Sequence, residues 1–228
     1  MPDSDLAALV TEVRAALREL ADPARAAGMQ AYLKTTEPCL GVRLPEVRRV
    51  TRAAAGDHPP GSVAEVVEVA GRLWREAAYR EERYAAQAVS GLRIARGDLR
   101  LLPLLEEMIT TGAWWDLVDG TQARVAELLD ADPVAMGPVI RGWARSPDRW
   151  LRRSAVIAQL GRKERTDTDL LTDAVLANAD DPDFFLRKAI GWALREHAKV
   201  APGWVAAFVA DHPLSPLSRR EATKHLRT

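Results

Sequence analysis

Residues 112–120, GAWWDLVDG, place two adjacent tryptophans in front of two carboxylates. On a helix, Trp115 and Asp119 are four residues apart and therefore share one face. Asp116 would lie in the first turn, where the positive end of the helix dipole favours an acid, so it has a structural role available. Asp119 has no such role, and Gly120 after it leaves room for close approach. The stretch therefore predicts an acid kept beside an aromatic surface for a ligand.

A second segment, SPDRWLRRSAVIAQLGRK (residues 146–163), concentrates arginines on one helical face. Arg149 and Arg153 are four residues apart, and Arg152 stands next to them. Exposed like charges at this spacing are slightly unfavourable, and a bound anion would relieve the repulsion. The arginine fork fits a phosphate well. The alternative is an ordinary solvated face paired with Asp148.

A third segment, FFLRKAIGWALREHAK (residues 184–199), carries a core stripe on one face and a cationic stripe on another. The core stripe consists of Leu186, Ile190, Ala193, Leu194 and His197. The cationic stripe consists of Lys188, Trp192, Arg195 and Lys199. This spacing predicts an aromatic plate within a phosphate-binding stripe, with a half-buried tryptophan under stacked arginines as the alternative.

A carboxylate in a phosphate-binding site repels its ligand, so its presence indicates a positive charge that needs stabilisation. One candidate is a purine made cationic by alkylation at N3 or N7. The other is the oxocarbenium sugar that forms when the glycosidic bond breaks. Indole faces attract a cationic base by about 0.5–2 kcal/mol each. A carboxylate favours the oxocarbenium and can orient water, and no strong general acid is needed because an alkylated purine leaves readily.

The spacing of apolar residues predicts helices for nearly all of the segments that would position these residues. Alanine, leucine, arginine and glutamate fill segments separated by proline, glycine and aspartate breakers. One helix of each pair starts near Arg80, Trp114, Arg149, Phe184 and Ser218. This period of about 35 residues predicts a single all-α domain over 1–228, an α-solenoid of HEAT or armadillo-like two-helix repeats with a basic concave face. A compact helical bundle is the alternative.

The charge distribution permits a basic stripe although the net charge is zero. Residues 1–140 hold 16 basic and 21 acidic side chains, whereas residues 141–228 hold 16 and 11. The single cysteine, Cys39, fits a reducing cytoplasm and forms no internal disulfide. The four histidines show no ligand spacing, so we expect no metal or other cofactor. No apolar run is long enough to span a membrane.

Four motifs together resemble the AlkD family of bacterial DNA alkylation-repair glycosylases. They are WWDLVD (114–119), WLRRSAVIAQL (150–160), KAIGWALREHAK (188–199) and PLSRREATKHL (216–226). The N-terminal segment MQAYLKTTEPCLGVRLPEVRRV (29–50) is similar too, in its Gly-Val-x-x-Pro turn. The likeness runs from about Met29 to the C-terminus. One departure is the small side chain of Cys39 in that turn, where the family often has a larger residue.

The resemblance implies hydrolysis of the N-glycosidic bond of N3- and N7-alkylated purines in duplex DNA, on a HEAT-like solenoid without metal. Asp119 would be the catalytic carboxylate, and Trp115 and Trp192 the flanking aromatic plates. Arg153 would hold the DNA backbone near the lesion, although Arg149 or Arg152 could take that role. The expected DNA-binding cations are Arg149, Arg152, Lys188, Arg195, Lys199, Arg219, Arg220 and Lys224.

Two other functions remain open at this point. A DNA-binding solenoid without chemistry would need the basic face but not Asp119. A protein-interaction scaffold, the commonest use of helical repeats, fits the net zero charge and the acidic first half. For the glycosylase we expect a cytoplasmic, nucleoid-associated bacterial monomer whose partner is double-stranded DNA that contains alkylated purines.

Overall fold

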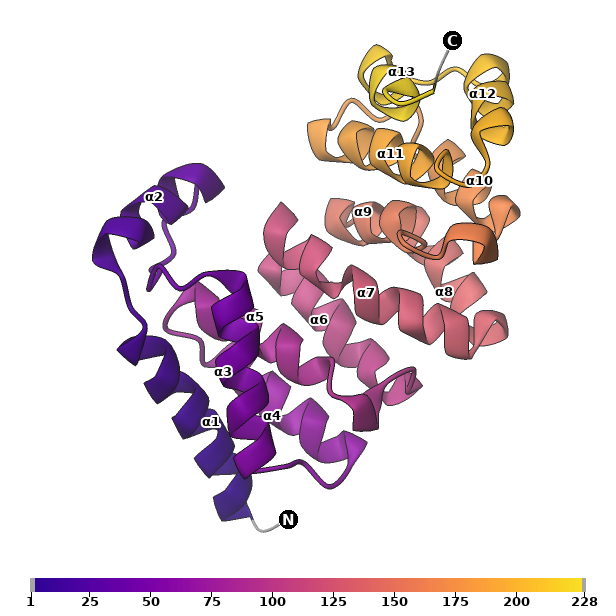
Figure 1. Cartoon of the computed structure of the whole chain (residues 1–228). Helices are drawn as coiled ribbons and strands as arrows, with labels where there is room; N and C mark the ends of the chain where they lie inside the picture. The colour runs from indigo at the N-terminus through magenta and orange to yellow at the C-terminus, as the bar shows by residue number, and fades with distance from the viewer. Residues whose placement is uncertain (1–2, 227–228) are drawn as a thin grey trace. The chain divides into compact units, whose positions relative to one another are not determined.

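The computed structural model of the chain describes residues 3–226, and the regular elements within this range are all helices. Figure 1 follows these helices along the chain. The sequence-based prediction of an all-α, HEAT-like solenoid is confirmed, whereas the basic concave face stays a prediction. The chain divides into two compact units, Met1–Leu105 and Glu106–Thr228, which are described separately.

Unit 1 packs its long helices around α5, which is mostly buried. Both α3 and α4 contact α5, and α1 lies against α3. Its elements are α1 (Asp3–Glu19), α2 (Pro23–Leu33), α3 (Leu44–Asp57), α4 (Val63–Arg75), α5 (Arg80–Ser90), the 3-10 turns η1 (Arg93–Ala95) and η2 (Leu99–Leu101), and the start of α6 (Leu102–Gly112).

The turn between α2 and α3 is held by charged side chains from the first turn of α5. The fully buried carboxylate of Glu81 accepts hydrogen bonds from the amides of Leu40 (2.9 Å), Gly41 (2.8 Å) and Val42 (3.1 Å). Beside it, buried Arg80 donates to the Glu37 carboxylate at 2.7 Å. The buried carboxylate thus accepts hydrogen bonds from backbone amides that have no partner in a helix or strand.

Gly41 is required in this turn by its conformation and by its surroundings. Its φ is +82°, in the left-handed region. A Cβ there would also lie 2.3 Å from the Asp22 carbonyl oxygen and 2.7 Å from the Ala26 nitrogen, at the start of α2. The Gly-Val-x-x-Pro pattern therefore marks the point where the chain passes closely against α2 before α3 begins at Leu44.

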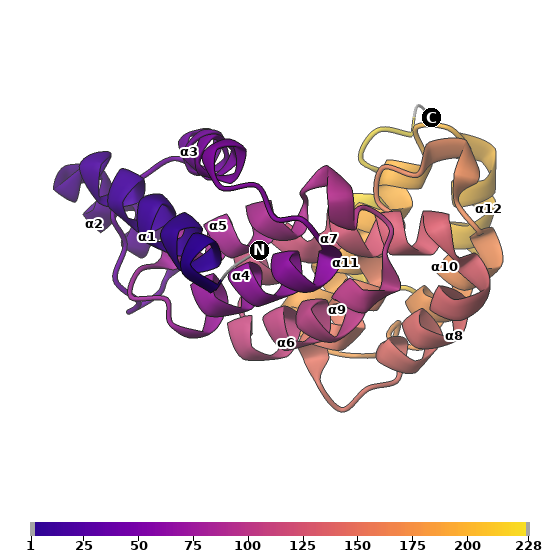
Figure 2. The ribbon, with the colours of Figure 1, turned by 90° about the horizontal axis from the view of Figure 1, so that it is seen from below.

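Unit 2 is a two-layer stack of helix pairs. The elements are the end of α6, then α7 (Trp115–Ala131), α8 (Pro133–Ala144), α9 (Arg149–Ile157), η3 (Lys163–Arg165), α10 (Thr168–Leu176), α11 (Phe184–His197), α12 (Pro202–Asp211) and α13 (Pro216–Thr223). Helices α7, α9, α11 and α13 contact one another in that order. Figures 1 and 2 both show α8, α10 and α12 along the other side of the stack. The predicted helix starts agree with these bounds to within two residues.

Polar contacts in unit 2 join each repeat to the next one. The Gln122 side chain of α7 donates to the Leu160 carbonyl just beyond α9 at 2.7 Å. Buried Asn178, after α10, donates to the Ala144 carbonyl at the end of α8 at 3.0 Å. These partners are about one repeat apart in sequence, as expected for a stack in which each repeat contacts only its neighbours.

Replacing Glu81 with Gln should destabilise the protein by about 1.5–3 kcal/mol, because an amide oxygen accepts fewer charge-assisted bonds and its NH2 group opposes a buried amide donor. Chemical denaturation of the two proteins measures this loss. The matched control is Glu76→Gln, since Glu76 is 59% exposed and its ion pair with Arg14 should contribute less than about 1 kcal/mol. Equal losses in both variants would contradict the role assigned to Glu81.

Candidate active site

Asp119 lies one turn into α7 and faces Arg153 of the adjacent helix α9. Arg153 donates from Nε to Asp119 Oδ1 at 2.8 Å and from Nη2 to Oδ2 at 2.7 Å. This two-pronged geometry is the strongest arrangement for an arginine and a carboxylate. The Asp119 side chain is 17% exposed and the Arg153 side chain 6%. The acid therefore has a fixed orientation and a small accessible face.

Arg153 also reaches a third helix. Its Nη1 donates to the Phe185 carbonyl oxygen, in the first turn of α11, at 2.7 Å. One guanidinium group thus joins α7, α9 and α11. The sequence analysis expected Arg153 to hold the DNA backbone, but in this structure Arg153 is buried and its donors bond to protein. Arg149, on the face that both were expected to share, is 47% exposed.

The pKa of the Asp119 carboxyl is raised above its ordinary value, because burial penalises the ionised form. The hydrogen bonds and charge of Arg153 oppose this rise, and the negative charge of Asp116 adds to it. Asp116 lies in the first turn of α7, as predicted. A carboxylate that water solvates poorly gains more from a cation placed beside it than a solvated one would. The site is therefore suited to stabilising a positive charge.

An aromatic cluster that the sequence analysis missed lies at the start of the same three helices. Trp114 lies 6.1 Å from Trp150 and 5.4 Å from Phe185, between ring centroids, and Trp150 lies 5.1 Å from Phe185. Phe184 adds an exposed ring, 5.5 Å from Phe185. The signal was present, because Trp150 and Phe185 occupy equivalent positions 35 residues apart, and equivalent positions of a solenoid lie next to each other.

The two expected aromatic plates lie on the helices that flank α9. Trp115 is the first residue of α7 and is partly exposed. Trp192 lies on α11, also partly exposed, with part of its surface against the hydrophobic core of α9–α13. Trp192 is therefore half-buried against that core, as in the alternative that the sequence analysis kept open. The five residues of the expected core stripe of α11 are all buried, in agreement with the prediction.

Most of the predicted DNA-binding cations are held by carboxylates. The pairs are Arg149 with Asp183 (3.3 Å), Arg152 with Asp181 (2.7 Å), Lys188 and Arg195 with Glu221 (3.1 and 2.7 Å), and Lys199 with Glu196 (2.6 Å). The guanidinium carbon of Arg149 also lies 4.9 Å from the centroid of the Trp150 ring. Asp148, named in the sequence analysis only as a partner in the alternative of a solvated face, instead caps α9 by accepting from the Trp150 and Leu151 amides.

The remaining predicted cations, Arg219, Arg220 and Lys224, belong to α13 and its C-terminal end. All three are exposed, and Arg219 donates to the His212 carbonyl oxygen at 3.3 Å. They are two helices along the stack from Arg153. The predicted basic residues therefore lie on or just after α9, α11 and α13, which are neighbours in one layer of the stack. Asp119 lies on α7, the helix next to α9 in the same layer.

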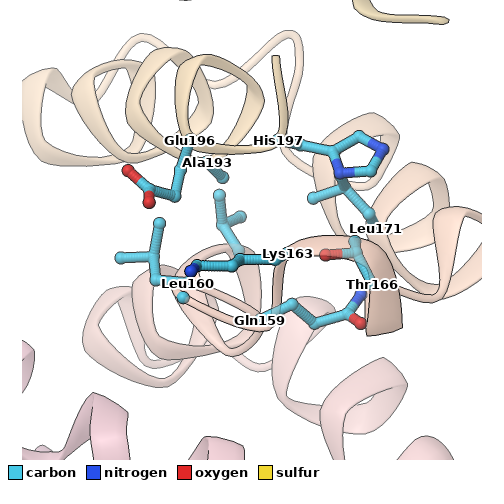
Figure 3. A pocket seen from close by; sticks show the side chains of 10 residues that line it. Gln159, Leu160, Lys163, Thr166, Leu171, Ala193, Glu196 and His197 are labelled. Atoms are coloured by element: carbon cyan, nitrogen blue, oxygen red, sulfur yellow. The ribbon is translucent and has the colours of Figure 1, made fainter. Parts of the chain in front are cut away.

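A pocket in unit 2 lies away from Asp119, at the C-terminal ends of α9 and α11. Its lining includes Lys163, Thr166, Glu196 and His197. Figure 3 shows the His197 ring at one side of this pocket and the Glu196 carboxylate at the other. His197 is 8% exposed, and neither of its buried ring nitrogens has a hydrogen-bond partner within residues 3–226. Its ring packs edge-on against Trp204 at 5.2 Å.

Burial lowers the pKa of His197 below its ordinary value. The unfolded chain therefore binds a proton at this residue more readily than the folded chain. Stability that depends on neutral His197 should be complete above the ordinary histidine pKa of about 6.5 and should fall as the pH decreases below it.

His197→Leu should accordingly remove part of the acid destabilisation. The measurement compares the free energy of unfolding at pH 8 and pH 5.5 for wild type, His197→Leu and a control, His225→Leu, whose side chain is exposed. The expected result is a smaller pH difference for His197→Leu alone. A pH difference unchanged from wild type would show that His197 does not titrate in this way.

Within residues 3–226, no group of three or more His, Cys, Asp or Glu side chains lies close enough to hold a metal ion. In the same part of the chain, no helix is long and apolar enough to cross a membrane.

Comparison with known proteins points to a single family. The family model described as DNA alkylation repair enzyme matches residues 13–226. A solved structure from Enterococcus faecalis, described as a predicted DNA alkylation repair enzyme, superimposes with a TM-score of 0.74 at 28% sequence identity. The likeness covers 91% of this chain and 97% of that one. No curated protein matches the chain.

Proposed function

Because the chain belongs to the family of DNA alkylation repair enzymes, we propose that it is a DNA N-glycosylase that removes N3- or N7-alkylated purines from duplex DNA. One observation carries this proposal: Asp119 is a largely buried carboxylate, 17% exposed, with a raised pKa, and a two-pronged bond to Arg153 holds it in a fixed orientation. A carboxylate in this setting suits a reaction that develops positive charge.

The reaction follows from the charge of the damaged base. When the bond between C1′ and the purine nitrogen breaks, its electron pair returns to the cationic purine, which leaves as a neutral molecule. The sugar becomes an oxocarbenium ion, and the ionised Asp119 stabilises it. Water then adds to C1′ and releases a proton to Asp119 or to solvent, so that an abasic site remains. The base needs no protonation, because alkylation has already made it a good leaving group.

Within this proposal, Arg153 is a positioning residue for Asp119. Its guanidinium charge favours the ionised carboxylate against the effect of burial. Its bond to the Phe185 carbonyl keeps it in place between α7 and α11. Phosphate contacts then fall to more exposed cations such as Arg149, which is 47% exposed. Trp115 and Trp192 would face the cationic base.

A second reading, a protein that binds DNA without chemistry, has one observation in its favour. Both oxygens of Asp119 bond to Arg153, so the pair could serve only to join α7 and α9. The substitution of Asp119 separates this reading from catalysis.

Replacing Asp119 with Asn should lower the single-turnover rate of base release from methylated duplex DNA by about 10²–10³-fold, the usual effect of losing one preorganised electrostatic group. DNA affinity should stay equal or increase, since an acid is removed. The matched control is Asp116→Asn, which removes the same charge three residues earlier on α7. Release at the wild-type rate by the Asp119 variant would rule the mechanism out and favour binding without chemistry.

In a plot of excision rate against pH, the rate falls on the acidic side. Replacing Arg153 with Met should move this acid limb to higher pH. Excision needs ionised Asp119 and is lost as the pH falls through its raised pKa. Because Arg153 lowers that pKa, its removal raises the pKa further. The profile is measured under single turnover with saturating protein, and the rate at neutral pH should fall by about 10²-fold if Asp119 is misplaced. Arg149→Met is the control, which should weaken binding without moving the limb.

A further inference from the structure

Glu221 of α13 bonds to two cations of α11 at once. Its Oε1 accepts from Lys188 Nζ at 3.1 Å, and its Oε2 accepts from Arg195 Nη1 at 2.7 Å. Arg195 Nη1 also approaches the Glu221 carbonyl oxygen at 3.4 Å. The Glu221 side chain is 17% exposed, whereas Lys188 is 39% exposed. One carboxylate therefore occupies the position between both cations.

The close approach of α13 to α11 makes this contact possible. A Cβ on Gly191 would lie 2.4 Å from Glu221 Cβ and 3.0 Å from the Ser218 carbonyl oxygen, so only glycine allows Glu221 to lie over α11 here. The Ser218 hydroxyl donates to the Arg187 carbonyl at 3.0 Å and holds the same crossing. Glu221 is thus placed by backbone packing, not by a flexible loop.

Lys188 and Arg195 keep Glu221 ionised. Their hydrogen bonds and charges lower the pKa of the Glu221 carboxyl. The two cations lie four residues before and three residues after Trp192 on the α11 stripe, where DNA phosphate is expected. Two oxygens that accept from an ammonium and a guanidinium group are also what a phosphate offers.

We propose that Glu221 is an internal competitor of DNA phosphate and sets the affinity of this face for DNA. The proposal rests on the DNA-binding function proposed above. A phosphate can bond to Lys188 and Arg195 only when the carboxylate releases them, so the gain from the new contacts is offset by the loss of the old ones. With Glu221 in place, binding neutralises fewer phosphates than the number of cations on this face would allow. Both the affinity for DNA and its dependence on salt are therefore weaker.

The experiment measures binding of undamaged duplex DNA by fluorescence anisotropy over a series of KCl concentrations. Glu221→Gln should bind about tenfold more tightly than wild type near 0.1 M salt, and the plot of log K against log salt should steepen by about 1–2 units for one or two additional phosphate contacts. The control is Glu164→Gln, which changes the net charge equally at an exposed residue of η3. Its affinity should change by less than twofold.

A second comparison separates competition from a structural role. Lys188→Met should weaken DNA binding by less than threefold in the wild-type chain, where Glu221 already occupies the ammonium group, and by tenfold or more in Glu221→Gln. Thermal unfolding of each variant reports whether α13 stays in place. Equal effects of Lys188→Met in both backgrounds, or affinity that does not rise in a folded Glu221→Gln, overturns the proposal.

If Glu221→Gln does not fold, Lys188→Met in the wild-type chain decides alone, and a loss of tenfold or more overturns the proposal. The readout uses undamaged DNA, so it is independent of excision. If Glu221→Gln does not bind DNA more tightly but base release still depends on Asp119, the inference about Glu221 is overturned and the proposed glycosylase function is not. A wild-type protein that binds no DNA at low salt would overturn both.

Discussion

The link between Arg153 and Asp119 is the interaction on which the candidate site depends. It brings a carboxylate of α7, a guanidinium of α9 and a backbone carbonyl of α11 into one bonded group. A buried pair of this kind contributes little net stability, since desolvation offsets most of the Coulomb attraction. What it provides is orientation, because a carboxylate with both oxygens bonded cannot rotate away from its partner.

The same repeat geometry explains how four short motifs that are far apart in sequence come together. Each helix pair contacts the next one, so residues about 35 positions apart become neighbours in unit 2, as Asp119 and Arg153 do. The fold class and the helix starts could be predicted because breakers and apolar spacing repeat with this period. The role of Glu81 in holding the turn between α2 and α3 could not be predicted, since a buried acid that accepts from backbone amides leaves no periodic signal.

The sequence indicates which residues share a helical face at the candidate site, but not which partners their side chains bind. Spacing on a helix shows that Arg149 and Arg153 lie near one face, but not that Arg153 turns inward to Asp119 while Arg149 pairs with Asp183. The choice of partner depends on the distance between neighbouring helices, which Gly191 sets where α13 crosses α11. The acids that neutralise the basic stripe were missed for the same reason.

The aromatic cluster gives this protein an optical property of its own. Trp114 is the N-cap of α7 and Trp150 lies in the first turn of α9, and their ring centroids are 6.1 Å apart at an interplanar angle of 61°. Two indoles this close, and not parallel, couple their electronic transitions and produce a near-ultraviolet circular dichroism band whose intensity depends on their spacing. The helices that hold Asp119 and Arg153 together therefore carry a built-in chromophore pair that would report any change in their separation without an added label.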